Sequence, residues 1–201
     1  MSENPVIIFD LGAVLIDWNP RHLYRRLFDD ERSMEAFLRD ICTPEWNAEQ
    51  DRGRSWQEAV DLLSAEHPEH RDLIHAYKDR WEDMLRGPID GTVAILERLD
   101  EGGHELHALT NWSAETFPIA RERYTFLDRF RSILVSGVEG LMKPDPAIFE
   151  LMLARIGHSA DRCLFIDDSS KNVEAAAGLG FDVIRFTSPK ALQIALEERG
   201  L

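Results

Sequence analysis

Three aspartates lie where buried strands are expected to end. Asp10, Asp167 and Asp168 each follow or close a short apolar run. Thr110 ends another such run, and Lys143 comes shortly after a further one. Because parallel strands present their carboxyl ends at one edge of a sheet, these five side chains are expected to converge. Each has a structural alternative of its own, such as capping the next helix, but the whole set favours a reactive site.

Clustered carboxylates repel one another unless a positive charge lies among them. Mg²⁺ suits such a cluster, because it is a hard cation that binds carboxylate and phosphate oxygens. Lys143 would neutralise part of the remaining charge, and the Thr110 hydroxyl and backbone amides would donate to phosphate oxygens. One aspartate would then be free to attack phosphorus and form an acyl phosphate. This combination of residues favours phosphoryl chemistry.

The elements that must position these residues alternate along the chain. Five apolar runs rich in β-branched residues are the predicted strands, at 6–9, 106–110, 132–136, 163–166 and 182–186. Helical spacing between them predicts helices such as 92–103, which Gly102 would end in a left-handed conformation. In 144–157, Asp145 is the expected N-cap and Gly157 the expected end. The βαβα order predicts an α/β fold, a doubly wound parallel sheet with helices on both faces.

Residues 17–88 interrupt this order. They contain four tryptophans and helical spacing but no convincing strand, which predicts a helical insertion. The candidate helices are 21–28, 34–42, 55–66 and 75–87, with turns near Thr43-Pro44, Arg52-Gly53 and His67-Pro68. We therefore expect a core domain made of residues 1–16 and 89–201, and a helical cap domain at 17–88.

Composition limits the partners. The 37 acidic and 23 basic residues give a formal charge of −14, which repels nucleic acids and anionic membranes. A small phosphorylated substrate stays compatible, because local donors or a cation can reverse the sign inside a cleft. The two cysteines, Cys42 and Cys163, are expected to be buried free thiols. Without a signal peptide or a membrane span in the sequence, we expect a cytoplasmic location; the oligomeric state is left open.

Four ordered motifs resemble those of the haloacid dehalogenase (HAD) superfamily. They are FDLGAV with Asp10, LTNWS with Thr110, GLMKPDPAIF with Lys143, and LFIDDSSKNVEAAAGLG with Asp167 and Asp168. The resemblance covers residues 5–186, and the insertion resembles the cap of the subgroup that contains 2-haloacid dehalogenases and many small phosphatases. Within it, the DLGxV form with paired aspartates is most similar to sugar-phosphate phosphatases of the α-D-glucose-1-phosphate phosphatase type. The resemblance implies a Rossmann-like core and Mg²⁺-dependent hydrolysis of a small phosphate monoester, with sugar phosphates as candidates.

The resemblance also implies roles for single residues. Asp10 would be the nucleophile. The implied metal ligands are Asp10, the backbone carbonyl of Gly12, Asp168 and, directly or through water, Asp167. The implied phosphate-binding residues are Thr110, Asn111, Lys143 and the pocket-lining Trp112. Thr110 and Lys143 are also implied in catalysis, with Lys143 orienting Asp10, while the role of Asn172 is left open.

Gly12 departs from the family pattern. Most phosphatases of the superfamily have an aspartate there, which protonates the leaving oxygen and later activates water. Glycine can do neither, which leaves open a slow phosphatase, an acid and base from water or another residue such as Asp17, or different chemistry. One alternative is a metal-independent 2-haloacid dehalogenase using Asp10, which the pair Asp167-Asp168 disfavours. The other is a weakly active binding or regulatory protein.

The cap is expected to close over the cleft and select the leaving group. Trp46, Asn47, Gln50 and Arg52 are candidates for facing the cleft, and Trp18 lies at the hinge. Tryptophans more often pack helices together, so a structural role is the stronger expectation for Trp46 and Trp18.

Overall fold

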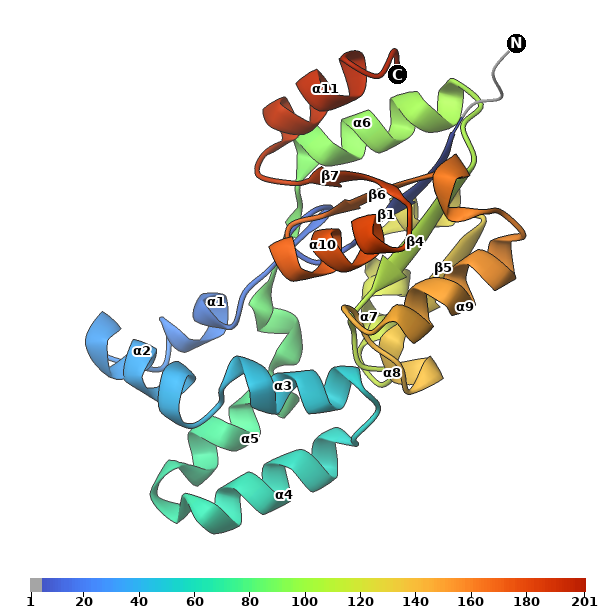
Figure 1. The fold of residues 1–201 in the computed structure, drawn as a ribbon. Coiled ribbons are helices and arrows are strands. Elements are labelled where there is room, and N and C mark those ends of the chain that lie inside the picture. The colour runs from blue at the N-terminus through green and yellow to red at the C-terminus, as the bar shows by residue number, and fades with distance from the viewer. Residues whose placement is uncertain (1–4) are drawn as a thin grey trace.

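The computed structural model describes residues 5–201 and has a five-stranded parallel sheet at its centre (Figure 1). The strands are β1 (Val6–Phe9), β4 (Leu106–Thr110), β5 (Ser132–Val135), β6 (Cys163–Asp167) and β7 (Asp182–Arg185). Their order across the sheet is β5-β4-β1-β6-β7. All five predicted strands are confirmed, each within one residue at either end. Residues 1–4 of the expected core segment 1–16 lie outside the described residues.

The first strand lies in the middle of the sheet. From β1 the chain builds β4 and β5 on one side, then crosses back to add β6 and β7 on the other. Alternate side chains of β1 enter opposite faces, Ile7 and Phe9 joining one apolar cluster and Val6 and Ile8 the other. The reversal of strand order beside β1 opens a crevice at the carboxyl edge of the sheet. Asp10, the next residue, is therefore positioned at that crevice.

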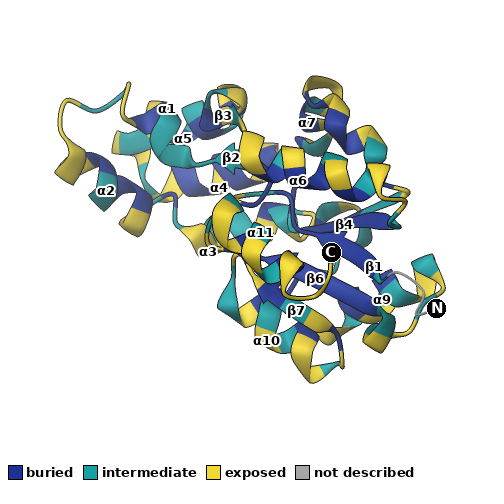
Figure 2. Ribbon diagram, turned by 90° about the horizontal axis from the view of Figure 1, so that it is seen from above, coloured by how far each residue is buried: buried dark blue, intermediate teal, exposed yellow. Residues whose placement is uncertain are grey.

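Helices cover both faces of the sheet, as the alternation predicted (Figures 1 and 2). On one face α6 (Asp90–Glu101) packs against α11 (Pro189–Glu197), and on the other α9 (Pro146–Ile156) packs against α10 (Ser170–Gly178). The remaining core helices are α7 (Phe117–Arg123), α8 (Ser136–Glu139) and the short 3-10 helices Thr125–Arg129 and Ala160–Arg162. The sheet is dark throughout its centre in Figure 2, while the helices alternate between buried and exposed residues.

Two predicted helix ends behave differently. Asp145 accepts a hydrogen bond from the Ala147 amide at 2.9 Å and Gly157 has φ +74°, which confirms both ends of α9. The left-handed residue after α6 is Gly103, with φ +78°, and the expectation for Gly102 was wrong. Gly102 has φ −71° and its amide still bonds to Arg98, so the helix runs one residue further before the chain reverses.

Residues 17–88, which we call the cap, form a helical layer beside the carboxyl edge of the sheet (Figure 1). Its helices are α1 (Pro20–Tyr24), α2 (Glu31–Asp40), α3 (Pro44–Asp51), α4 (Trp56–Glu66) and α5 (Arg71–Asp79), with 3-10 helices at Pro68–His70 and Trp81–Met84. The helix α3 was not predicted, although the turns at Thr43-Pro44 and Arg52-Gly53 mark its two ends. The division at residues 17 and 88 remains our proposal.

Two short strands connect the cap to the core, and the expectation of no strand was wrong here. β2 (Ile16–Trp18) pairs antiparallel with β3 (Leu85–Pro88), so β3 replaces the end of the helix predicted at 75–87. Each strand is short and pairs only with a segment about 70 residues away, which no local pattern reveals.

No helix within residues 5–201 is long and apolar enough to cross a membrane. Cys42 and Cys163 are both buried free thiols, as expected.

Candidate active site

Asp10 lies directly after β1 and is only 8% exposed. Its Oδ1 accepts a hydrogen bond from the Leu11 amide at 2.7 Å, and its Oδ2 lies 3.1 Å from the Lys143 ammonium. Burial raises the pKa of Asp10 to about 7; Lys143 opposes this shift, while the neighbouring carboxylates of Asp167 and Asp168 add to it. The site therefore needs further positive charge to keep Asp10 ionised at neutral pH.

Lys143 is buried and contacts three oxygens. Its Nζ donates to the backbone carbonyl of Leu109 at 2.8 Å and to Asp167 Oδ2 at 2.6 Å, besides pairing with Asp10. Burial alone would lower the pKa of Lys143, but the two carboxylates outweigh it and raise the pKa above its ordinary value. Asn111 holds the backbone here, because its side chain accepts from the Lys143 amide and donates to the Lys143 carbonyl, both at 2.9 Å. The expected role of Asn111 on phosphate stays a prediction.

Asp167 is fully buried and surrounded by donors. Besides Lys143, the Ser169 amide donates to Oδ1 at 2.8 Å, and the Asn172 amide lies 3.1 Å from both carboxylate oxygens. Asn172, whose role was open, therefore positions Asp167. Asp168 is exposed as a residue, but its carboxyl group is partly buried. This partial burial raises the pKa of Asp168, and the negative charge of Asp167 adds to the shift. The two neighbouring acids thus differ: Asp167 orients Lys143, while Asp168 has a carboxylate available for a ligand.

The three acids fit a divalent cation. Carboxylate oxygens of Asp10, Asp167 and Asp168 lie within 4.8 Å of one another. One lysine does not balance three carboxylates, so their charge favours a cation. An all-oxygen donor set of this kind suits Mg²⁺ better than softer metals.

Thr110 ends β4, the strand next to β1. The residue is 1% exposed, and its hydroxyl has no hydrogen-bond partner within residues 5–201. An unpaired buried hydroxyl is costly, so this group is suited to donate to a ligand oxygen beside Asp10.

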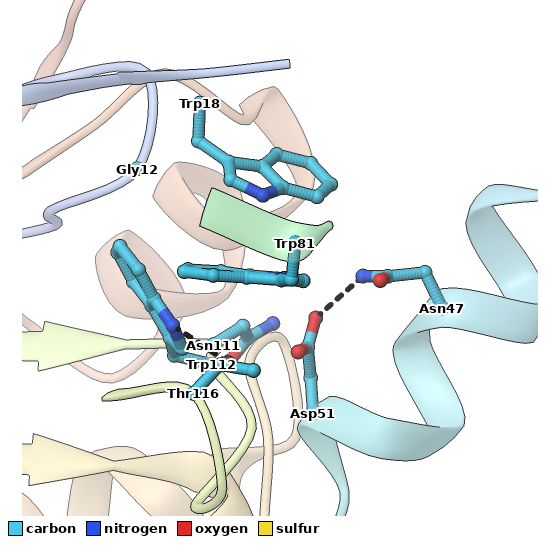
Figure 3. Close-up of a pocket in the computed structure, with 8 residues that line it drawn as sticks. All are labelled: Gly12, Trp18, Asn47, Asp51, Trp81, Asn111, Trp112 and Thr116. Atoms are coloured by element: carbon cyan, nitrogen blue, oxygen red, sulfur yellow. Dashed lines mark hydrogen bonds between the residues drawn. The ribbon is translucent and has the colours of Figure 1, made fainter. Parts of the chain in front are cut away.

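A narrow pocket of about 50 Å³ lies between the core and the cap (Figure 3). It is lined by Gly12, Trp18, Asn47, Asp51, Trp81, Asn111, Trp112 and Thr116. Three indole rings form much of its wall; Trp112 packs against Trp81 with ring centroids 5.6 Å apart and donates to Thr116 at 3.1 Å. The Nε1–H of Trp18 is buried, with no acceptor in the part of the chain that the structure describes. The wall of this pocket is therefore largely aromatic.

Asp51, at the end of α3, is a carboxyl group of this pocket that the sequence did not single out. Its Oδ2 accepts from the Asn47 amide at 3.1 Å, and its backbone carbonyl accepts from Ser136 Oγ at 2.5 Å. Burial raises the pKa of Asp51 to about 7, opposed by a hydrogen bond from the Ser113 amide. Its position two residues before Gly53 was the available signal, but the burial that matters depends on how α3 docks on the core.

The other cap residues singled out from the sequence divide into two groups. Asn47 and Trp18 line the pocket. Trp46 packs edge-on against aromatic rings inside the cap, Gln50 is fully buried and bonds to the Trp46 carbonyl, and Arg52 is exposed. These three residues have structural or surface positions.

The chain thus combines a doubly wound parallel sheet with an acid at its switch point and a buried lysine beside that acid, which is the class of α/β protein that the motif resemblance predicted. A model of the haloacid dehalogenase-like hydrolases matches residues 5–180, so the chain belongs to this family. The predicted family and fold are confirmed.

Relatives extend over most of the chain. The sesquiterpene phosphatase astK of Aspergillus oryzae is 29% identical over 192 residues, covering 95% of this chain and 94% of its own. The phosphoglycolate phosphatase of Mesorhizobium japonicum is 25% identical, covering 90% and 82%. A HAD family enzyme of Bacteroides thetaiotaomicron, solved with magnesium, superposes with a TM-score of 0.72 at 19% identity, covering 92% and 94%. The last similarity is one of fold.

Proposed function

We propose that this hydrolase is a Mg²⁺-dependent phosphatase that acts on a small phosphate monoester through an aspartyl-phosphate on Asp10. The observation that carries the proposal is the pairing of Asp10 with buried Lys143 at the edge of a three-carboxylate cluster. The phosphatase names of its relatives support the same reaction. The same charge cluster disfavours a metal-free dehalogenase.

In the first step, a carboxylate oxygen of Asp10 attacks phosphorus while the bond from phosphorus to the ester oxygen breaks. Water then attacks the aspartyl-phosphate, which releases inorganic phosphate and regenerates the carboxylate. Lys143 and the free Thr110 hydroxyl are placed to stabilise the charge on the phosphoryl oxygens. Asp10 and Asp168, with the Gly12 carbonyl, would hold Mg²⁺, which supplies positive charge to the phosphoryl group when bound.

Both steps need proton transfer, and Gly12 has no side chain for it. We assign this role to Asp51, because its carboxyl group lines the same pocket as Gly12 and has a pKa near neutrality. Asp17, the alternative considered from the sequence, pairs with His22 at 2.9 Å and does not line the pocket.

A sugar phosphate is the finer substrate prediction, and the motif resemblance supports it. The named relatives differ from one another in substrate, a sesquiterpene phosphate ester in one case and phosphoglycolate in another. The leaving group therefore has to be argued from the pocket.

The test of the proposed function is phosphate release from p-nitrophenyl phosphate with Mg²⁺ and with EDTA. We expect activity only with Mg²⁺, and none in Asp10→Asn, while the exposed control Asp72→Asn keeps wild-type rates. Chloride release from 2-chloropropionate without metal would replace this proposal with the dehalogenase. Activity on neither substrate would favour a binding protein.

A further inference from the structure

A second and larger cavity adjoins the narrow pocket inside the cap. Its volume is about 310 Å³, against about 50 Å³ for the pocket between core and cap. Trp18 and Asn47 line both spaces, and Gly12 of one is followed in the chain by Ala13 of the other. In Figure 3 these two side chains lie at the edge of the first pocket. The organic part of a substrate that extends from the phosphate past Trp18 and Asn47 would therefore enter this cavity.

The narrow pocket alone is too small for a substrate. A volume of about 50 Å³ holds only a few water-sized atoms. The organic group of a substrate therefore extends beyond this pocket, either toward solvent on its open side or into the larger cavity. The larger cavity, at about 310 Å³ against about 50 Å³, offers roughly six times that volume.

The walls of the larger cavity are mainly apolar. Leu38, Cys42 and Pro44 contribute alkyl and thiol surface, and Trp18 and Tyr77 contribute aromatic rings. Leu38 and Cys42 are 5% and 3% exposed. Burial raises the pKa of the Cys42 thiol to about 12, so the group stays neutral at physiological pH.

Three polar side chains of the cavity wall, Asn47, Tyr77 and Arg21, already have protein partners, whereas the buried Nε1–H of Trp18 has none among the described residues. Asn47 donates to Asp51 and accepts from the Tyr77 hydroxyl at 3.2 Å. Arg21 forms a two-pronged ion pair with Glu35, at 2.5 and 2.7 Å. A hydroxyl-rich sugar placed here would find one free donor, the Trp18 Nε1–H, and would bury its other hydroxyls without partners, which costs free energy for each group. An alkyl or alkenyl body would bury its surface without that cost.

We infer that the cap cavity receives the organic body of the leaving group, and that the substrates are phosphate monoesters of apolar alcohols rather than of sugars. This inference rests on the proposed function for turnover. The cavity can also be tested by binding alone, so the two proposals fail separately.

The first experiment measures kcat/KM for n-alkyl phosphates from ethyl to octyl, with α-D-glucose 1-phosphate as the polar comparison. We expect kcat/KM to rise about three- to fourfold per added methylene until the cavity is full. Hexyl phosphate should exceed glucose 1-phosphate at least tenfold. A flat series, or a preference for glucose 1-phosphate, would overturn the inference while leaving the phosphatase proposal intact.

The second experiment measures binding of n-alkylphosphonates to Asp10→Asn by calorimetry, with Mg²⁺ present. We expect the affinity to grow with chain length and the heat-capacity change of binding to become more negative. Affinity independent of chain length would contradict the inference whether or not any ester is hydrolysed. If phosphonates bind in this graded way but no ester is turned over, the proposed function fails and the cavity assignment stands.

A variant locates the effect. Cys42→Leu adds side-chain volume at the cavity wall, and we expect it to lower kcat/KM for octyl phosphate at least fivefold with little effect on ethyl phosphate. Leu62→Phe, on the exposed side of α4, is the matched control and should leave both unchanged. Equal losses for the two esters, in a protein with unchanged thermal unfolding, would place the alkyl body elsewhere.

Discussion

Replacing Asp51 by asparagine removes a titratable group and keeps its shape. An asparagine Oδ1 can still accept from one of the two amides, Asn47 or Ser113, that donate to Asp51, but the side chain cannot deliver or take up a proton. Because proton transfer by a positioned side chain contributes about 10²- to 10⁴-fold, kcat for an alkyl phosphate should fall by that range. The loss should be smaller in the phosphorylation step of p-nitrophenyl phosphate, whose leaving group needs no proton.

The same substitution has a stability signature whose sign is fixed by the pKa. Burial raises the pKa of Asp51 from 3.8 to about 7, so the folded protein binds this proton more tightly than the unfolded chain. Stability is therefore lost as the pH rises from about 4 to 7, and the loss is complete above about pH 7. A shift of this size corresponds to about 4 kcal/mol, which partial solvent access reduces to about 2–4 kcal/mol.

Asparagine carries no charge, so Asp51→Asn should avoid this loss. We expect its free energy of unfolding to match that of the wild type near about pH 4 and to exceed it by about 2–4 kcal/mol near about pH 8. Urea unfolding at both pH values measures the difference, with Asp72→Asn as the control for an exposed carboxylate. A variant more stable and less active than its parent is the expected mark of a group kept for function.

Two results would refute the role of Asp51. A stability difference that does not change with pH would mean that the pKa of Asp51 is not raised in the folded protein above its value in the unfolded chain. A kcat within about threefold of wild type, with the limb near pH 7 still present in the pH profile, would mean that another group transfers the proton.

Three further substitutions test the core of the site. A Cβ at Gly12 would meet no atom within 4 Å, so Gly12→Asp should fold normally. Added to the Asp51→Asn variant, Gly12→Asp should raise kcat at least tenfold, because it supplies a new carboxyl group for proton transfer. Lys143→Met leaves two buried carboxylates without their cation and should cost about 3–5 kcal/mol in urea unfolding, besides abolishing phosphate release. In Gly137→Ala the new Cβ would lie 2.5 Å from the Ala114 amide nitrogen, so we expect a thermal unfolding temperature several degrees lower and a higher KM.

The core part of the site could be predicted because topology alone brings it together. Asp10, Thr110 and Asp167 each occupy the end of a strand, and adjacent parallel strands place their ends side by side whatever the details of packing. Lys143 is less constrained by its strand, and the motif carried its assignment. Asn172 is one turn into α10, where its contact with Asp167 depends on the exact direction of the side chain.

The cap part of the site could not be predicted in the same way. Asp51 and Trp81 belong to elements whose spacing is ordinary, and nothing in the local pattern distinguishes a carboxylate that faces a cleft from one that faces water. The positions of both side chains depend on how α3 and the β2–β3 pair dock on the sheet. This docking is determined by contacts between residues far apart in the chain. The local turn signals at Thr43-Pro44 and Arg52-Gly53 located the ends of α3 without revealing the helix.

If Asp51 of the cap is the acid and base, as we propose, the reaction depends on how the cap docks on the core. Ser136 Oγ donates to the Asp51 carbonyl at 2.5 Å and accepts from the Trp112 amide at 2.9 Å, so it joins the cap to the loop after Thr110. Ser136→Ala removes both contacts but no titratable group. We expect kcat to fall about two- to tenfold, because the net contribution of one such hydrogen bond is about 0.5–1.5 kcal/mol.

A purely positioning role predicts that the pH profile of Ser136→Ala keeps the limb near pH 7 that Asp51→Asn loses. Because the apolar body of a substrate would hold the cap closed, the defect should also be smaller for octyl than for ethyl phosphate. Equal defects for both esters would show that cap docking and leaving-group binding are independent. In that case Asp51 would reach the ester oxygen whether or not an alkyl group fills the cavity. The choice of substrate and the rate of proton transfer would then be independent of each other.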